Sequence, residues 1–131
     1  MAASKSLEDR IRAIEDRLEI YNVIASHPPS ADHQAAIERG LAHFTSLPHV
    51  AINGDTAVVT SYLQILVPQT QGDPVDVPNH GRSKGFRVHR MTANRWELVR
   101  TAQGWKIKRR TLRQLDGSEA AQKILRQAIA P

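Results

Sequence analysis

The segment ASHPPSADHQ, from Ala25 to Gln34, gathers two histidines, an aspartate and two prolines. Imidazole and carboxylate groups are the usual general acids and bases near neutral pH, and they also bind metal ions. His27, Asp32 and His33 lack the helical His-x-x-x-His spacing, and prolines separate them, so we expect no metal site. The segment is therefore a sharp corner between two helices, or a corner whose aspartate also does chemistry.

The composition is that of an ordinary folded protein. With 131 residues the chain can form one hydrophobic core, so we expect a single domain over residues 1–131. The chain has no cysteine, which excludes disulfides and thiolate metal sites. Because the sequence has no apolar run of membrane-spanning length and no apolar signal segment near its start, we expect a cytoplasmic location and no membrane partner.

The net charge of +5 raises the question of nucleic-acid binding. Basic residues are concentrated between Arg82 and Arg113, but the chain has only two residues each of Trp, Tyr and Phe to stack on bases. We therefore favour the interpretation that the basic residues form solvated faces of amphipathic strands, and we do not expect nucleic-acid binding.

Three helices are predicted. The first covers residues 6–26, where apolar residues recur at steps of three and four and the apolar face widens toward the end; Pro28 and Pro29 then end it. The second covers residues 33–45, with Asp32 as its N-cap and His43 within it. Ser118 caps a third helix at the C-terminus.

Between the second and third helices the apolar pattern alternates with a period of two, which indicates strands. We expect strands over residues 48–53, 55–67, 84–101 and 105–115, a loop over 68–83 and a bulge near 92–94. The 55–67 strand has apolar residues on both faces, so both faces should be partly covered. Helices followed by a meander of strands indicate an α+β protein with the helices on one face of a curved sheet.

Two stretches resemble a known family. The first is the hairpin Asn53-Gly54-Asp55-Thr56-Ala57, and the more specific second is WELVRTAQGWKIKRRTL, in which two strands are joined at Gly104. Together with the long first helix, the pattern from about Leu7 to Leu115 resembles the SnoaL-like branch of the NTF2-like superfamily. The resemblance implies a cone-shaped α+β fold, with N-terminal helices packed on a curved, mainly antiparallel sheet that encloses a pocket.

The resemblance also implies an acid/base pair. In enzymes of this family an aspartate beyond the first helix acts with a histidine on the helix before the sheet, and Asp32 and His43 match them by position. A hydrogen bond from imidazole to carboxylate fixes the tautomer of such a base. An arginine of the last strand, Arg109 or Arg110, would stabilise a developing anion, and we assign Arg109. The alternatives are that Asp32 only caps a helix and that His43 is a core histidine.

Further residues are candidates for the pocket. Tyr62 lies in the middle of its strand, where it either donates a hydrogen bond to a substrate carbonyl or simply packs. The expected pocket lining is Tyr21, Ile24, Leu41, Phe44, Asn94, Trp96 and Ile107. Compared with the family, the connection before His33 is shorter by roughly 40–50 residues. This shortening should open the pocket or expose apolar surface for a second subunit.

The favoured function is a cofactor-independent lyase, isomerase or hydrolase that acts on a small apolar organic ligand, in a protein that forms a homodimer. The sequence contains no glycine-rich phosphate loop and no nucleotide fingerprint, so no cofactor is implied. The main alternative is a non-catalytic ligand-binding or dimerisation domain of the same fold.

Overall fold

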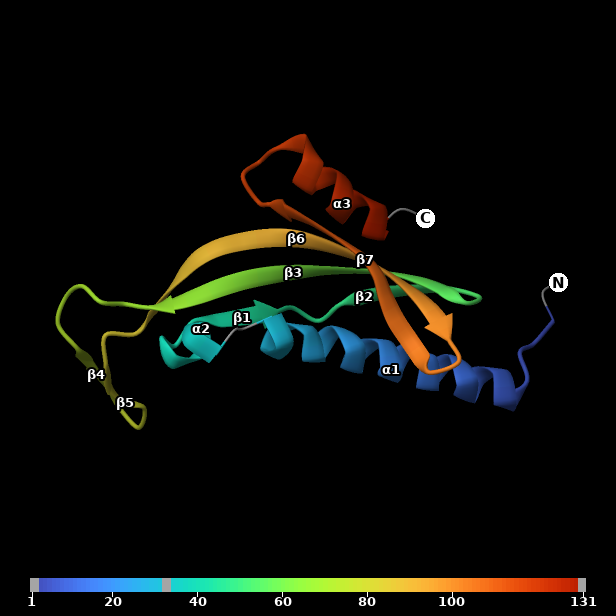
Figure 1. The fold of residues 1–131 in the computed structure, drawn as a ribbon, viewed down its shortest axis with the longest axis horizontal. Helices are drawn as coiled ribbons and strands as arrows, with labels where there is room; N and C mark the ends of the chain where they lie inside the picture. Colours follow the sequence, from blue (N-terminus) through green and yellow to red (C-terminus); the bar gives the residue numbers. More distant parts are fainter. Residues whose placement is uncertain (1–2, 32–33, 130–131) are drawn as a thin grey trace.

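The computed structural model describes residues 3–31 and 34–129. Helices and strands follow one another in the order α1 (Leu7–Ala31), α2 (Gln34–Glu38), β1 (Ala42–Thr45), β2 (His49–Asn53), β3 (Thr56–Pro68), β4 (Val75–Val77), β5 (Gly81–Ser83), β6 (Phe86–Thr101), β7 (Gly104–Gln114) and α3 (Glu119–Ile129). This order confirms the predicted α+β class, and Figure 1 shows the long first helix below a curved sheet.

The main sheet is antiparallel and is built on the long pair β3 and β6. Strand β7 follows β6, while β1 and β2 both pair with β3, β1 near its C-terminal end and β2 near its N-terminal end. The strands predicted over 48–53, 55–67, 84–101 and 105–115 correspond to β2, β3, β6 and β7.

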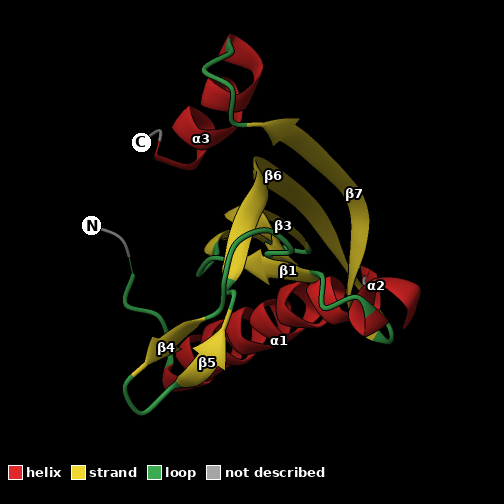
Figure 2. Ribbon diagram, turned by 90° about the vertical axis from the view of Figure 1, so that its left-hand side faces the viewer, coloured by secondary structure: helices red, strands yellow, loops and turns green. Residues whose placement is uncertain are grey.

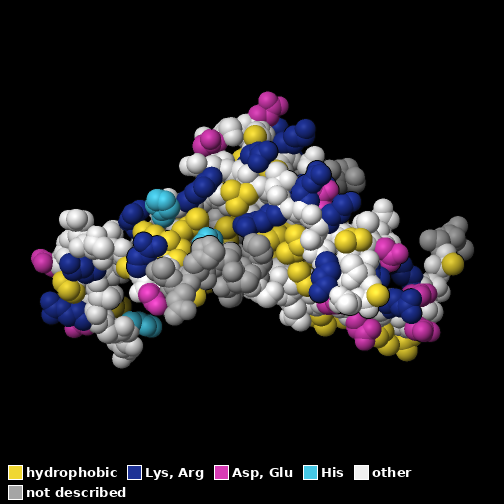
Figure 3. Space-filling model, in the orientation of Figure 1, with side chains coloured by type: hydrophobic (Ala, Val, Ile, Leu, Met, Phe, Trp, Pro, Cys, Tyr) yellow, Lys and Arg dark blue, Asp and Glu magenta, His cyan; other side chains and the backbone are white. Residues whose placement is uncertain are grey.

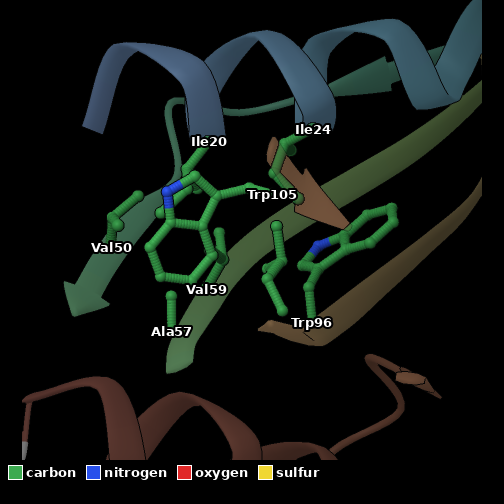
Figure 4. Close-up of a cluster of buried hydrophobic side chains, with 8 residues drawn as sticks. Ile20, Ile24, Val50, Ala57, Val59, Trp96 and Trp105 are labelled. Atoms are coloured by element: carbon green, nitrogen blue, oxygen red, sulfur yellow. The ribbon is translucent and has the colours of Figure 1, made fainter. Parts of the chain in front are cut away.

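The hydrophobic core lies between α1 and one face of the sheet, which we call the inner face (Figure 4). Ile20 and Ile24 of α1 are buried against this face, as the widening apolar stripe predicts. The N-terminal half of α1 leaves its apolar residues exposed, among them Leu7 and Ile14. The core residues are Ile20, Ile24, Val50, Ala57, Val59, Trp96, Leu98 and Trp105.

Helix α3 covers the opposite face of the sheet, which we call the outer face (Figures 1 and 2). The prediction that all helices share one face is therefore wrong for α3. Successive strand residues point to opposite faces, so Val59 faces α1 while its neighbour Thr60 lines grooves beside α3. Ala121 and Ile124 bury the apolar stripe of α3 on the outer face. The apolar residues on both faces of β3 are thus explained.

The helix predicted over 33–45 is correct for Gln34–Glu38 and wrong for its second half. Helix α2 ends at Glu38, Gly40 adopts a φ of +75°, and β1 begins at Ala42. The apolar spacing of this segment fits a helix, but hydrogen bonds to β3 outweigh it, with His43 opposite Ile65. His43 is therefore a strand residue.

Three boundaries also differ from the prediction. Helix α1 continues past Pro28 and Pro29 to Ala31, because proline's fixed φ is compatible with a helix even though its missing N–H weakens it. The predicted loop over 68–83 contains the small hairpin of β4 and β5. The bulges lie at His89 and Lys108, not near 92–94, because the register shifts there relative to β3 and β6.

Candidate functional site

A band of polar side chains interrupts the inner face beside the hydrophobic core. Ser61, Thr92 and Asn94 are all almost completely buried, with 3%, 1% and 0% of their surface exposed. Ser61 and Asn94 face each other across β3 and β6, next to the pair Val59 and Trp96. A fold does not need hydroxyl and amide groups at this depth, since burying them costs free energy unless every group is paired. The band is therefore a candidate functional site.

Arg110 of β7 brings a positive charge into this band. Its Nε and Nη2 atoms donate to Asn94 Oδ1 at 3.0 and 2.9 Å. Its guanidinium lies over the Trp96 ring, 4.5 Å from the ring centroid. Burial lowers the pKa of Arg110 from its ordinary value, yet arginine remains charged near neutral pH because that value is so high. The polar band thus includes a partly desolvated, oriented cation.

Hydrogen bonds inside the band fix its geometry. Asn94 Nδ2 donates to Thr92 Oγ1 at 3.0 Å, which leaves the amide oxygen directed at Arg110. Trp96 Nε1 donates to Ser61 Oγ at 3.1 Å and so holds the ring under the guanidinium. Among the described residues, Thr45 Oγ1 is buried without a hydrogen-bond partner. Thr45 lies opposite the buried Leu63, which places it on the inner face too.

Only His43 of the predicted Asp–His pair lies among the described residues. His43 is half-buried on β1, and its pairing with Ile65 puts it on the inner face, one row beyond Thr45 and Leu63 along the strands. Asp32 lies outside the described residues. The pairing of Asp32 with His43 therefore stays a prediction from the sequence.

Arg109 and Arg110 point to opposite faces. Arg109 lies opposite Glu97 on the outer face, with 71% of its side chain exposed and a long contact of 3.9 Å to Glu97. Strict alternation from Trp105 and Ile107 would have placed Arg109 inside. The extra residue Lys108 reverses that alternation and puts Arg110 inside instead.

Two other predicted site residues lie away from the band. Tyr62 is 44% exposed and lies on the outer face, where it lines a groove of about 300 Å³ together with His49 and Leu125. Phe44 is 60% exposed and pairs with Gln64, on the same outer face. Neither is brought next to Asn94 or Arg110.

The remaining expected lining residues lie on the inner side or beside the core. Ile24 and Trp96 are buried in the core, and Tyr21 and Ile107 pack against it. Leu41 is half-buried just before β1. Asn94 is the expected residue that forms the centre of the polar band. The burial of Ser61 and Thr92 was not predicted, although the alternation along β3 and β6 places both on the same face as Val59 and Trp96.

A second polar cluster joins α1 to the far end of the sheet. Arg100 of β6 forms a two-pronged ion pair with Asp16 and also binds Asp55 at 2.9 Å. Trp105 Nε1 donates to Asp16, and the Trp105 backbone N–H donates to Glu19. Because these contacts tie three elements together and the acids are already paired, we assign the cluster a structural role. Among the described residues, no three acidic or histidine side chains gather in a way that would hold a metal ion.

The model of the SnoaL-like domain family matches residues 34–111, which is more than half of the chain. The chain belongs to the SnoaL-like domain family. A solved NTF2-like protein with a cystatin-like fold from Novosphingobium aromaticivorans is similar, with 27% identity and a TM-score of 0.76. The comparison covers 94% of this chain and 99% of that protein. The similarity therefore extends over nearly the whole length of both proteins.

A search of curated proteins finds no match to this SnoaL-like chain. No helix in the described part of the chain is both long and apolar enough to cross a membrane. Domains of this fold family generally bind a ligand.

Proposed function

We propose that this SnoaL-like protein binds a small organic molecule against the inner face of its sheet, with Arg110 holding an anionic or carbonyl oxygen of the ligand. The observation that carries the proposal is the position of the Arg110 guanidinium, half-buried, stacked on Trp96 and oriented by Asn94. A planar guanidinium favours carboxylate, enolate and similar oxygen pairs, and partial burial strengthens that attraction.

The neighbouring groups support a ligand that is mainly apolar. Trp96, Leu63 and Ile107 make the surroundings of the band apolar, and the first two are buried, while Thr45 Oγ1 is a buried hydroxyl with no partner among the described residues. A few polar groups among apolar side chains are the usual make-up of a site that fixes the orientation of a small molecule. A flat or cyclic ligand with a single acidic or carbonyl group fits these features.

Catalysis is the finer part of the proposal. A cofactor-independent lyase or isomerase would use His43 to remove a proton from a carbon next to a carbonyl. The electron pair of the C–H bond would move toward the carbonyl oxygen, where Arg110 would stabilise the negative charge. From the sequence, Asp32 remains the predicted partner that would orient His43.

The test compares two neighbouring arginines. The full chain is titrated with a panel of small carboxylates, phenolates and carbonyl compounds, using thermal shift and calorimetry. For a ligand found in this way, Arg110→Gln should weaken binding by at least about tenfold, because the charged fork is lost. Arg109→Gln removes the same charge from the outer face and should leave binding unchanged. Equal affinity in both variants would overturn the proposal. If Arg110→Gln fails to fold, Arg110→Lys is used in its place, because lysine keeps the charge but lacks the two-pronged guanidinium.

His43→Gln then separates an enzyme from a binding protein. Turnover that is lost while ligand binding is kept supports the acid/base role. Unchanged turnover in His43→Gln removes His43 from the mechanism. If the native protein binds the ligand but does not convert it, the protein is a ligand-binding domain and not an enzyme for that ligand.

A homodimer formed through the outer face is the second candidate function. Phe44, Val88 and Met91 are 60%, 49% and 39% exposed; Phe44 lies on β1 and the other two lie on β6, on the opposite side of β3. An exposed apolar sheet face of this kind often marks a protein interface. Light scattering should give twice the monomer mass, and Phe44→Glu should shift it toward the monomer. A native monomer at high concentration would exclude this proposal.

A further inference from the structure

A basic groove on the outer face is separate from the site on the inner face. It has a volume of about 320 Å³ and lies between α3 and the strands β6 and β7. Arg95, Arg113 and Lys123 line it, together with the hydroxyl residue Thr111. Its lining contains no carboxylate, and Ala120, Ile124 and Gln127 form its wall on α3.

The three cations come together because of the fold, not because they are close in sequence. Arg95 and Thr111 face each other across β6 and β7, and both point outward. Arg113 follows on the same face of β7 by alternation. On α3, Ala120, Lys123, Ile124 and Gln127 follow helical spacing, so one stripe of that helix faces the strands. Strand and helix periodicity thus bring Lys123 opposite the two arginines.

Of the three cations, Arg95 is paired with a nearby acid, whereas Arg113 and Lys123 form no ion pair among the described residues. Glu97 lies on the same face of β6 and pairs with Arg95 at 2.9 Å. Arg113 donates from Nη1 to the carbonyl of Leu112, and among the described residues Lys123 has no hydrogen bond or ion pair. Asp116 and Glu119 stand at the start of α3, and Asp116 already accepts a hydrogen bond from the Ser118 N–H. In Figure 3 several basic side chains lie around α3 with acidic ones at its upper end, and acidic and basic side chains are mixed around α1.

From this arrangement we propose that the groove binds a phosphate group, either free phosphate or the phosphate of a small monoester. Like charges around one hollow repel each other, and a bound dianion removes that repulsion. Arginine, lysine and threonine are frequent donors to phosphate oxygens. Ile124 and Ala120 give the organic part of a monoester an apolar surface to contact.

The groove lies directly behind the proposed ligand site. Asn94 and Arg110 face inward, while the residues that follow them in sequence, Arg95 and Thr111, face outward. The two sites share β6 and β7 but no side chain. Binding in the groove can therefore be tested without altering any residue of the inner band.

The experiment titrates the full chain with inorganic phosphate and, separately, with phenyl phosphate, using amide NMR shifts and calorimetry at two salt concentrations. The double variant Arg113→Gln/Lys123→Gln should weaken binding by about tenfold or more. The matched double variant Lys106→Gln/Lys108→Gln removes the same charge from exposed positions of β7 outside the groove and should bind as the native protein does. Tighter binding of phenyl phosphate than of phosphate would identify a monoester site.

Three outcomes would overturn the proposal. The first is an equal loss of affinity in both double variants, which indicates only general attraction to a basic surface. The second is the absence of shifts at groove residues when phosphate saturates the protein. The third is binding of an RNA or DNA oligonucleotide without binding of phenyl phosphate, which would make the surface a polyanion interface instead. If the double variant is unstable, Lys123→Gln alone serves the same comparison.

Discussion

Asp16 and Arg100, which are 84 positions apart, form a two-pronged ion pair between α1 and β6. The guanidinium Nη1 and Nη2 atoms reach the two carboxylate oxygens at 2.6 and 2.8 Å. Arg100 also lies over the Trp105 ring at 4.6 Å from its centroid. Because only the C-terminal half of α1 packs into the core, this pair is the polar anchor for the middle of the helix.

Asp16→Asn should lower the free energy of unfolding by about 2 kcal/mol, because the Arg100 charge loses its main partner while it remains partly buried. Chemical denaturation of native and variant protein measures the change. Glu15→Gln is the matched control, since Glu15 is an exposed acid on the neighbouring position of α1 and should cost little. Equal costs for the two substitutions would show that the ion pair contributes nothing specific.

The same pair should make the stability depend on acid pH. The hydrogen bond from Arg100 is the main reason that the pKa of Asp16 is lowered in the folded protein. Because the pKa of Asp16 is lower in the folded protein, ionised Asp16 contributes its full stabilisation above the unfolded pKa of about 3.9. This stabilisation is lost as the pH falls through the pKa of the folded protein. The unfolding free energy of native protein should therefore decline below about pH 4 more steeply than that of Asp16→Asn. Parallel pH profiles for the two proteins would contradict the assignment.

The extended part of the fold could be predicted from sequence, because strand alternation and turn glycines are local signals. The turns at Gly54 and Gly104 have φ values of +59° and +94°, which explains why the starts of β3 and β7 can be predicted to within one residue. The C-terminal helix was equally visible through Ser118 and its apolar stripe. The face of the sheet that this helix covers could not be predicted, because the helix sequence does not determine on which side of the sheet it packs.

The site was harder to predict, because two of its features depend on long-range pairing. The spacing of Leu41 and Phe44 fits a helix, and only the pairing of β1 with β3 makes His43 a strand residue. The choice between Arg109 and Arg110 depends on the bulge at Lys108, which has no signature in the sequence. The inward position of Asn94 was predictable, because it shares its face with Trp96 and alternation was unbroken between them.

Gly40→Ala should destabilise the protein by about 2 kcal/mol, because two effects add. Gly40 has a φ of +75°, and a Cβ there would lie 2.9 Å from Cγ of Pro68. Gly72→Ala is the matched control: its φ is +79°, but no atom lies within 4 Å of the added Cβ, so only the backbone strain remains, about 1 kcal/mol. Thermal and denaturant unfolding give both values. A cost for Gly40→Ala no larger than that for Gly72→Ala would mean that Pro68 moves aside freely.

Deletion of Lys108 should be tolerated, whereas deletion of Lys106 should not. Lys108 is the extra residue of a bulge, so its removal restores regular pairing and leaves Ile107 and Arg110 on the inner face. Lys106 lies in the regular part of β7, opposite Val99, and its loss would turn Trp105 or Ile107 away from the core. The Lys108 deletion should keep a cooperative transition close to that of the native protein, and the Lys106 deletion should lose most of it. Equal tolerance of the two deletions would show that β7 can slide, and that the inward position of Arg110 does not depend on this register.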